Sequence, residues 1–508
     1  MGNVKVFRDT IHGYIEIEKD IVSSIIDTAL FQRLRRIEQT SMRCLYPAAR
    51  HDRFIHSIGT FHLAKKISTN LSRKFQDLKN QDFDFVFDEK YFCKLQFNLE
   101  LAALLHDVGH SPFSHTLEEY FKLEKIDGDV KINKQLKDAL SVCVEPGIHT
   151  TFCQDFANAH PSPHEIISAT ISITEFKDQI KELCKNRSVD VDYDFIIRAI
   201  TGTLYENADK ALDNCFIRLL NSSAIDVDKL DYITRDSEIS GYDNVKVDTD
   251  RLVASITPWQ FTNNKGEQQL ILTYDKTALS VIQNVVTCRN ALYTWIYSHH
   301  KVQYETSLIS TAIKEIAKIE NPDNPNSFIT QMFCLENIVE NCLCDDDIWC
   351  LFKKHKNLQC IKELLDRGSQ KSALWKSFVE FKELFPEREC DLKLGDFSVE
   401  NFKQIAGSNA SEAEEFKKYL YEYNDIKIDV QIIKTSIKLS SIDRSAILIL
   451  LNDHVYSYNT LLEELNPNLT INSFLYIYVD KKTKENLDYA DFIKYIKAYP
   501  KFSMMPPM

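Results

Sequence analysis

The chain has 508 residues, of which 44% are hydrophobic and 27% charged, proportions that suit a soluble globular protein with a real core. Its formal net charge of −13 excludes a globally basic surface for nucleic acid, so an anionic substrate must meet a local basic cluster. Thirteen cysteines without an apolar leader, and no apolar run long enough for a membrane span, favour free thiols and a cytoplasmic location, or a nuclear one if the source is eukaryotic.

Apolar periodicity predicts that the first part of the chain is mainly helical. Residues 1–20 alternate like a hairpin or an edge strand, and helices are expected at 21–38, 51–75, 95–107, 163–185, 193–206 and 210–240. Ser162-Pro163 has the pattern of an N-cap followed by proline at the first helical position. Residues 124–162 are polar and rich in glycine and proline, and we interpret them as an inserted loop.

The later part of the chain is expected to mix helices and strands. A two-residue period over 251–274, centred on the turn signal 263–266, predicts a hairpin, and helix returns at 275–318. The turn-rich stretch 320–327 predicts a domain boundary, so we expect domains at 1–320 and 321–508. Helices are expected to about residue 385, strands within 426–439, 446–451 and 474–479, and a short helix at 490–498.

Two histidines and two aspartates form the main chemical signal of the sequence. The adjacent pair His106-Asp107 lies in an apolar helical run that Gly109 and Pro112 should end at the site. An isolated His-Asp pair is more often a buried hydrogen-bonded pair than a metal site. Together with His56 and Asp228, however, it makes a mixed nitrogen and oxygen set suited to Fe, Mn, Zn or Ni.

Basic and polar residues flank this set in a way that suits a phosphorylated sugar. Arg53 stands three residues before His56, and Lys229 directly follows Asp228. A cation beside a metal ligand is favourable when a phosphate joins the two, although Arg53 alone would more often be a solvated surface charge. One helix face carries Asp228, Tyr232 and Asp236, which recur at every fourth position.

Further histidines follow the His-Asp pair. His110 and His115 lie within ten residues of it, and Glu118 is placed to orient the imidazole of His115. An imidazole beside a metal and a phosphate can donate a hydrogen bond or transfer a proton. His164-Glu165 begins another helix, where a surface histidine near the cap is an equally good reading.

In combination these residues resemble the signature of the HD-domain phosphohydrolases. The resemblance is stronger to the deoxynucleoside triphosphate triphosphohydrolases that are joined to a SAM domain in vertebrates and have bacterial dGTPase relatives. It runs from about residue 5 to residue 305. The matching segments are 9–16, 26–35, 51–57, 106–115 and 225–236, and Arg289-Asn290 with Tyr297.

The resemblance implies a mainly α fold with an HD-domain helical core and small β-hairpin elements, and the residue pattern after 425 adds a mixed α/β C-terminal region. It assigns one divalent metal to His56, His106, Asp107 and Asp228. It places His115, supported by Glu118, beside the α-phosphate, with His110 nearby and His164 as the acid. It gives triphosphate contacts to Arg53, Lys229, Arg289 and Tyr297, and sugar contacts to Gln39, Tyr232 and Asp236. Mg²⁺ is expected to accompany the triphosphate.

The interval between His115 and His164 is longer than in the family because of the stretch 124–162. His149 or His160 could therefore take the role of the acid, although only His164 is followed by a glutamate.

The resemblance also implies regulation by a nucleotide, GTP or a dNTP, bound between subunits of a homo-oligomer (a dimer, tetramer or larger assembly). The matching positions are Lys5, Val6, Asp27, Gln32 and Arg35. We expect residues 321–508 to support the oligomer and its regulation. Depletion of dNTPs would serve pool control or defence against a virus or phage.

Two other functions fit the metal set. One is an HD phosphodiesterase that acts on single-stranded or cyclic nucleic acid, which the acidic net charge and the Tyr232–Asp236 stripe disfavour. The other is a nucleotide-sensing oligomer without turnover, which the retained His115 disfavours.

Overall fold

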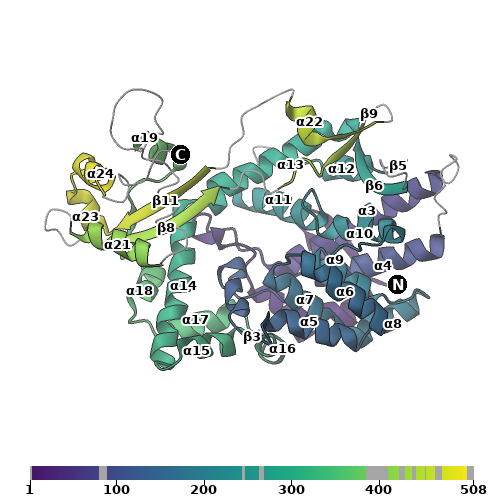
Figure 1. The fold of residues 1–508 in the computed structure, drawn as a ribbon, viewed down its shortest axis with the longest axis horizontal. Helices are drawn as coiled ribbons and strands as arrows, with labels where there is room; N and C mark the ends of the chain where they lie inside the picture. The colour runs from purple at the N-terminus through teal and green to yellow at the C-terminus, as the bar shows by residue number, and fades with distance from the viewer. Residues whose placement is uncertain are drawn as a thin grey trace. The chain divides into compact units, whose positions relative to one another are not determined.

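The computed structural model describes residues 3–78, 88–242, 246–262, 268–384, 410–422, 430–437, 442–451, 454–463 and 472–499 (Figure 1). The chain is mainly helical with small sheets, as expected. Its contacts form two compact units that interleave in sequence. The first comprises Met1–Arg289, Ala317–Leu351 and Ser440–Pro467, and the second Asn290–Ile316, Phe352–Leu439 and Asn468–Met508. This division differs from the single boundary expected near residue 320.

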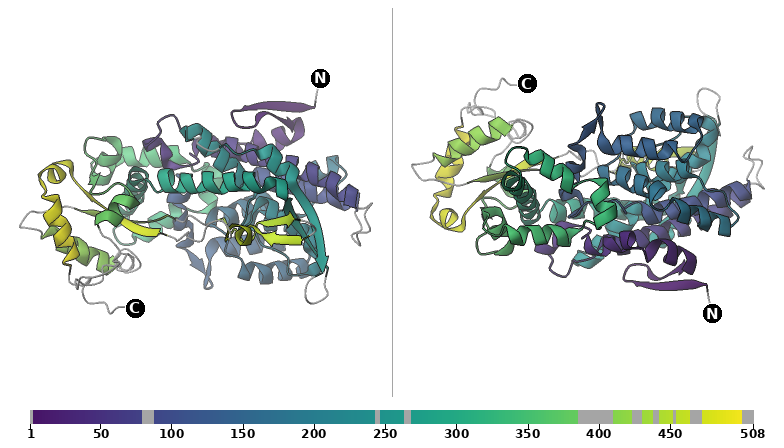
Figure 2. Two further views of the ribbon diagram at one scale, coloured as in Figure 1. Left: turned by 90° about the horizontal axis from the view of Figure 1, so that it is seen from above. Right: turned by 90° about the horizontal axis from the view of Figure 1, so that it is seen from below.

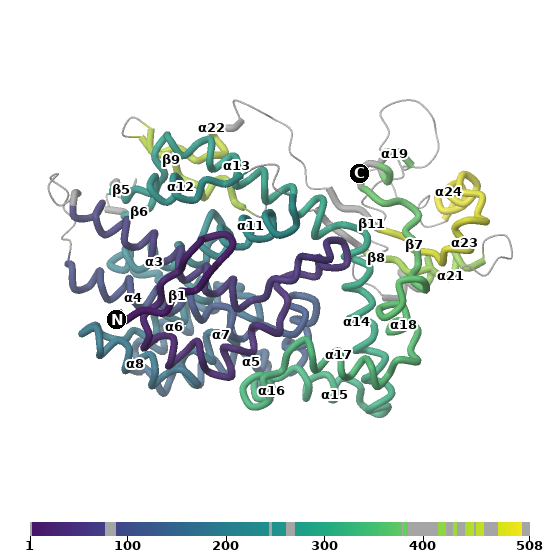
Figure 3. The backbone as a smooth tube through the Cα atoms, turned by 180° about the vertical axis from the view of Figure 1, so that it is seen from behind, coloured from purple at the N-terminus to yellow at the C-terminus, as the bar shows by residue number. Residues whose placement is uncertain are grey.

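The N-terminal alternation forms an antiparallel hairpin. Strands β1 (Val4–Asp9) and β2 (Gly13–Glu18) pair with Val4 opposite Glu18, and Ile15 and Ile17 point into the core. Figure 3 shows this purple hairpin beside the long helix α3 (Arg53–Leu78), which β2 contacts. The helix expected at 21–38 is instead a series of short turns, of which the longest is the π-helical Val22–Ile26.

A bundle of helices forms the centre of the first unit. Its members are α3, α4 (Glu89–Leu105), α7 (Pro163–Thr174), α8 (Lys177–Asn186), α9 (Tyr193–Thr201), α10 (Ala211–Leu220) and α11 (Val227–Ser240). The C-terminal half of α4 is buried on all sides, so its apolar run has no solvent face. Helix α3 packs against both α4 and α11, and this arrangement brings the candidate metal ligands of all three helices together.

Two glycines allow helices of the bundle to approach closely. A Cβ atom at Gly109 would lie 2.5 Å from the backbone nitrogen of Ser168 in α7. A Cβ atom at Gly59 in α3 would lie 2.0 Å from a carboxylate oxygen of Asp231 in α11. Since real Cβ contacts are not this short, any larger residue would push these helices apart.

The stretch 124–162 is not the loop expected from the sequence. It contains two short strands, β3 (Lys125–Ile126) and β4 (Asp129–Val130), and two helices, α5 (Lys131–Ser141) and α6 (Pro146–Asn158). Ile132, Leu136 and Leu140 recur at every fourth position of α5 and are buried where α5 packs on α7. The polar composition that suggested a loop belongs to the solvent face of this amphipathic helix.

A four-stranded sheet in the order β10-β9-β6-β5 covers part of the first unit. After α12 (Thr249–Ser255), the predicted hairpin forms from β5 (Ile256–Thr262) and β6 (Gln268–Asp275), and the predicted turn lies outside the described residues. Strand β9 (Leu448–Leu451) pairs in parallel with β6 and antiparallel with β10 (His454–Ser457). Figure 2 shows these yellow-green strands beside the teal hairpin. Helix α22 (Tyr458–Glu463) follows.

The first unit also takes in a set of later helices, namely α15 (Pro325–Met332), α16 (Leu335–Asn341) and the start of α17 (Asp345–Lys354). Helices α13 (Leu279–Ala291) and α14 (His300–Glu320) each cross from one unit to the other. The second unit contains a three-stranded sheet in the order β7-β11-β8, formed by Ser372–Ala373, Asn472–Val479 and Gln431–Ile437. Its helices are α18 (Gln359–Leu365), α19 (Phe378–Leu384), α21 (Ala410–Tyr421), α23 (Lys481–Asn486) and α24 (Tyr489–Lys497).

Among the described residues, no helix has the length and apolar character that a membrane crossing requires.

Candidate functional site

The four candidate metal ligands meet in the first unit. His56 lies on the first turn of α3, and Asp228 lies on the first turn of α11. Helix α4 ends at Leu105, so His106 is its C-cap and Asp107 lies in the turn that follows, not inside the helix as the sequence suggested. The His56 Nε2 atom is 3.0 Å from Asp228 and 3.6 Å from Asp107, and His106 Nε2 is 3.7 Å and 3.6 Å from the same carboxylates.

These distances fit coordination of one ion. Donor atoms each about 2.0–2.2 Å from a metal lie roughly 2.8–3.6 Å apart in tetrahedral or octahedral geometry. The Nε2 atoms of His56 and His106 are buried and have no hydrogen-bond partner among the described residues. Buried polar atoms without a partner are costly, and a shared cation would satisfy both of them. The residues present therefore fit a divalent metal.

The outer nitrogens of both imidazoles are already occupied, which orients the inner ones. His56 Nδ1 donates to Asp231 over 2.7 Å, and His106 Nδ1 donates to the carbonyl of Ala103 over 2.8 Å. A proton fixed on Nδ1 leaves Nε2 as the ligating atom. Burial alone would lower the pKa of His56, but the carboxylates of Asp228 and Asp231 raise it to about 10. This excess of negative charge is what a divalent cation would neutralise.

Asp231 is a buried junction that the sequence analysis did not single out. Its carboxylate accepts from His56, from His12 Nε2 at 2.7 Å, and from two nitrogens of Arg235 at 2.8 and 2.9 Å. Arg235 in turn binds Asp9. Burial alone would raise the pKa of Asp231, but Arg235 and the two imidazoles hold it well below its usual range. The signal was present, since Asp231 lies three residues after Asp228 and therefore on the same helix face.

Arg53 is buried beside the metal set. Its guanidinium donates to Asp107 over 2.5 Å, to Ser114 over 2.9 Å and to the carbonyl of Gln39 over 3.3 Å. Burial alone would raise the pKa of Asp107, but Arg53 and the neighbouring imidazoles hold it well below its usual range. The side-chain oxygen of Gln39 is buried and has no hydrogen-bond partner among the described residues.

Three further imidazoles gather around the carboxylate of Glu118. His115 Nδ1 lies 2.7 Å from one of its oxygens, and His164 Nδ1 lies 2.6 Å from the other. The ring of His110 stacks on that of His164 with centroids 4.3 Å apart. His115, His110 and His164 thus form a second group of potential ligand atoms, separate from the group of His56, His106 and Asp107.

The histidines of this second group differ in charge. Burial alone would lower the pKa of His164, but Glu118 raises it to about 9. Burial and the nearby cations, Arg53 first, hold the pKa of His110 well below its ordinary value. At neutral pH, His164 therefore carries a proton that it can give up, whereas His110 is neutral.

The structure distinguishes the three candidates for the acid. The capping box of Ser162 and Glu165, with Pro163 at the first position, starts α7 as predicted and holds His164 beside Glu118. His149 lies on α6 and its ring bonds to the carbonyl of Lys137. His160 is exposed in the loop before α7. Among the three, only His164 lies in the histidine group with His110 and His115.

Residues 53–183 match the HD domain. The matched range includes His56, the His106-Asp107 pair and the histidine group, while Asp228 lies beyond it. Within the matched range, the side chains of His56, His106 and Asp107 lie close enough together to hold one metal ion.

Relatives of the whole chain are distant. It is 26% identical to the uncharacterised protein YwfO of Bacillus subtilis over 63% of this chain and 57% of that protein. It is 29% identical to the deoxynucleoside triphosphate triphosphohydrolase SAMHD1 of Bos taurus over 58% of this chain and 45% of that protein. The chain thus spans about half the length of these curated relatives. A solved phosphohydrolase from Bacteroides thetaiotaomicron shares the fold, with a TM-score of 0.56 at 21% identity over 94% of this chain and all of that one.

The other residues that the resemblance assigned to substrate contacts have the following partners within the protein. Lys229 binds the carboxylate of Asp226, the N-cap of α11, over 2.5 Å. Asp236 is buried and bound by His51 Nε2 over 2.6 Å, and Tyr232 lies one turn before it. Arg289 is buried at the end of α13. Tyr297, whose ring packs on Tyr293, belongs to the second unit.

Segment 317–351 forms hydrogen bonds with the loops that carry the site residues. Asp345 accepts from the backbone nitrogens of Glu38 at 3.0 Å and Phe113 at 2.7 Å. Burial raises the pKa of Asp345 to about 7. Arg33 adds hydrogen bonds to the carbonyls of Leu343, Val108 and His110. Contacts between residues this far apart in sequence leave no local signal, so the sequence alone does not predict them.

The residues expected to bind a regulatory nucleotide lie near the N-terminal hairpin. Lys5 and Asp27 form an exposed ion pair at 3.3 Å. Gln32 accepts from Arg35 over 2.9 Å, and Val6 is 52% exposed. The regulatory role of these residues stays a prediction.

Proposed function

We propose that the chain hydrolyses deoxynucleoside triphosphates to a deoxynucleoside and inorganic triphosphate. The observation that carries this proposal is the occurrence together of two sites, a carboxylate-rich metal set and the protonated His164, whose ring stacks on that of His110, three residues beyond Asp107. The first suits a cation, and the second suits the leaving oxygen of a phosphate ester. The name of the SAMHD1 relatives supports the substrate class.

The roles of the side chains follow from their geometry. A divalent ion held by His56, His106, Asp107 and Asp228 would polarise a phosphoryl group and supply a nucleophile at neutral pH. Glu118 fixes the Nδ1 proton of His164, so the second proton of the charged ring, on Nε2, is the one available to the 5′-oxygen. His115 is exposed and oriented by the same carboxylate, which suits a hydrogen bond to a phosphoryl oxygen.

Sugar recognition is assigned to Gln39, Tyr232 and Asp236, and triphosphate contacts to Arg53, Lys229, Arg289 and Tyr297. The buried side-chain oxygen of Gln39 supports its part, because a hydroxyl group of the substrate would satisfy it. Arg53 already bridges Asp107 and Ser114, so it would reach a phosphate only as a further partner. We also propose that a nucleotide at Lys5, Val6, Asp27, Gln32 and Arg35 activates a homo-oligomer.

The test is a direct assay. The purified chain is incubated with Mn²⁺ and Mg²⁺ and with each dNTP, singly and mixed, and triphosphate is measured by ion chromatography. Release of triphosphate in equal amount to deoxynucleoside is the expected result. Cleavage of single-stranded DNA or a cyclic dinucleotide without triphosphate would replace the proposal with a phosphodiesterase. Nucleotide binding without any turnover would replace it with a sensor.

A further inference from the structure

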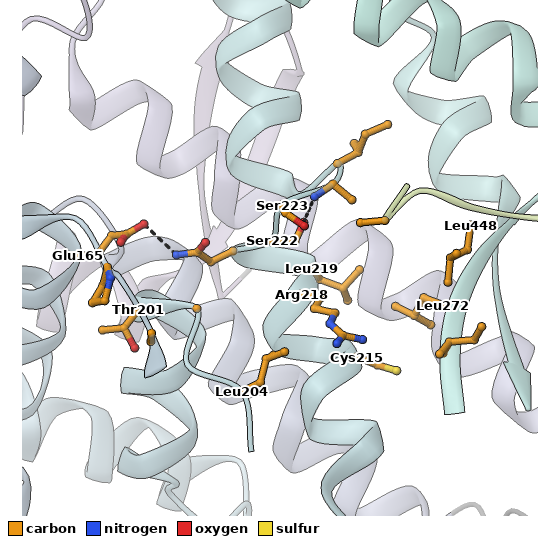
Figure 4. A pocket seen from close by; sticks show the side chains of 18 of the residues that line it. Glu165, Thr201, Leu204, Cys215, Arg218, Leu219, Ser222, Ser223, Leu272 and Leu448 are labelled. Atoms are coloured by element: carbon orange, nitrogen blue, oxygen red, sulfur yellow. Dashed lines mark hydrogen bonds between the residues drawn. The ribbon is translucent and has the colours of Figure 1, made fainter. Parts of the chain in front are cut away.

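A second cavity, which we name the Arg218 cavity, lies in the first unit apart from the metal set. Its volume is about 620 Å³, within the range of small-molecule sites. Its wall is drawn from the loop 159–162, the ends of α9 and α10, the loop 221–225, strands β5 and β6, and residues Ala446 and Leu448 (Figure 4).

The last of these segments returns from far along the chain to close the wall. The backbone nitrogen of Asp443 donates to the carbonyl of Ser223 over 2.7 Å. Two strand pairs, Tyr274 with Ile449 and Asp275 with Leu450, then fix β9 beside β6. Leu448 is thereby placed as one side of the cavity. The cavity is thus built by long-range contacts and is not a gap between neighbouring helices.

The lining divides into an apolar wall and a basic edge. The apolar wall includes Leu204, Leu219, Leu272 and Leu448. The basic edge consists of the guanidinium of Arg218 and the imidazole of His160, both exposed, and neither makes a hydrogen bond or an ion pair with another described residue. Figure 4 shows the guanidinium of Arg218 between the side chains of Leu204 and Leu272.

The acid in the lining, Glu165, forms no ion pair with Arg218 or His160 among the described residues. Glu165 already accepts from the backbone nitrogen of Ser162 at 2.6 Å and from the side-chain amide of Asn221 at 2.8 Å. An exposed arginine alone would be a solvated side chain. An unpaired guanidinium over an apolar concavity, in a chain with net charge −13, instead favours an anion with an apolar body.

We propose that the Arg218 cavity binds a small organic anion, with one carboxylate or phosphate monoester group at Arg218 and an apolar body against the leucines. A nucleoside triphosphate fits poorly, since its several negative charges would meet one guanidinium and one imidazole beside the carboxylate of Glu165. The ligand class therefore differs from that of the proposed substrate.

The occupant of the cavity would touch the turn that holds His164. Ser162 and Glu165 line the cavity and also form the capping box that starts α7, with His164 between them. On the other side of this turn, His164 binds Glu118. Binding in the cavity would thus order the same backbone that positions the candidate acid. Only this link to catalysis rests on the proposed function, and the binding itself does not.

The test uses 1-anilinonaphthalene-8-sulfonate, a fluorescent apolar anion, with the full chain. We expect Arg218→Ala to weaken binding of the probe at least about tenfold by removing the charge, and Leu204→Trp to do the same by filling the cavity. Arg251→Ala, which changes an exposed arginine outside the lining, is the matched control and should leave the affinity unchanged. Circular dichroism confirms that each variant is folded.

Hydrogen exchange locates the bound probe independently of activity. Protection should appear in peptides that cover 159–168 and 218–225, and it should persist in Asp107→Ala. Displacement by octanoate or by phenyl phosphate distinguishes a carboxylate site from a phosphate ester site, and inorganic phosphate, which has no apolar body, should not compete. Unchanged affinity in either Arg218→Ala or Leu204→Trp, or protection confined to other peptides, would overturn the proposal. Loss of dNTP hydrolysis with this binding intact would count against the proposed function alone.

Discussion

The two histidine groups of the first unit approach each other in sequence at Asp107 and His110, with only Val108 and Gly109 between them. Their surroundings nevertheless have opposite charge. Around His56 and His106 lie the carboxylates of Asp107, Asp228 and Asp231. Around Glu118, in contrast, lie the imidazoles of three histidines. The first group has more carboxylates than imidazoles, and the second has more imidazoles than carboxylates.

This difference in charge explains why histidine suits metal binding in one group and proton donation in the other. In the carboxylate-rich group the surrounding negative charge attracts a cation, and the bond from His56 Nδ1 to Asp231 leaves Nε2 as the atom that would bind it. In the imidazole-rich group a single carboxylate raises the pKa of His164 to about 9, while burial keeps His110 neutral. One group therefore suits a metal, and the other suits a proton.

The largest effect is expected when a carboxylate is removed from the first group. Asp107→Ala should reduce bound metal and dNTP hydrolysis to background, because the variant loses a ligand. It should also destabilise the fold by about 3–5 kcal/mol, since it leaves Arg53 buried without its charged partner. Metal is measured by inductively coupled plasma mass spectrometry and stability by urea unfolding. Asp346→Ala, at an exposed position, is the control. Full metal content in Asp107→Ala would show that the ligand assignment is wrong.

The role of the second group is tested by replacing His164, the side chain that carries the proton. His164→Gln should lower kcat by about 10²–10⁴, the usual contribution of a general acid, with metal content unchanged. In the wild-type chain, kcat should fall as pH rises through about 9, because His164 is active only while protonated. His149→Gln and His160→Gln should leave both properties alone. If either of these two variants loses the alkaline limb and His164→Gln retains it, the acid has been misplaced.

Asp231 offers a finer test, because it touches the first group without being a ligand. Asp231→Asn keeps the shape but removes the charge that fixes the Nδ1 proton of His56. Metal affinity should fall about 10–100-fold, as for other partners of ligating histidines. The alkaline limb assigned to His164 should stay in place. Asp250→Asn, at an exposed ion pair, serves as the control. Metal affinity within twofold of wild type would show that Asp231 has only a packing role.

The parts of this comparison that were predictable from sequence are those encoded locally. The spacing of Arg53 and His56, the His106-Asp107 pair and the Ser162-Pro163 start of α7 each involve residues no more than three positions apart in the sequence. The junction at Asp231 joins elements more than 170 positions apart, and Asp345 reaches back to Glu38 from a later helix. Such contacts leave no periodicity, so only the fold reveals them.

The error over 124–162 has a different cause. Helix α5 buries only Ile132, Leu136 and Leu140, and its other positions are polar except for Ala139. A narrow apolar stripe with glycine and proline on either side gives the segment the composition of a loop. Its apolar residues nevertheless recur at every fourth position, which is the spacing of a helix. The strand expected within 446–451 did form, but no local pattern indicated that it would pair with β6.

Both histidine groups should be indifferent to substitution of Asp27 and Arg35, the exposed charges assigned to the regulatory nucleotide. Asp27→Ala and Arg35→Ala should abolish stimulation of dNTP hydrolysis by added GTP or dNTP, while metal content and the pH profile stay as in the wild type. Asp20→Ala, which breaks an ion pair with Arg187 instead, is the control. Stimulation equal to wild type in both variants would remove the regulatory assignment and leave the two groups unaffected.

The smallest expected effect is on stability, and it concerns the second group alone. A raised pKa stabilises the fold below the unfolded value, so the contribution of His164 is complete below pH 6.5 and is lost as pH rises to about 9. Glu118 has a lowered pKa, so its contribution is present above pH 4.5 and is lost in acid. The free energy of unfolding of the wild type should therefore exceed that of Glu118→Gln most between pH 4.5 and 6.5, by at most about 3 kcal/mol. Urea unfolding at pH 5.5, 7.5 and 9.5 measures it, with Glu119→Gln as the control. A difference that grows toward pH 9.5 would mean that the Glu118–His164 contact is not the ion pair described.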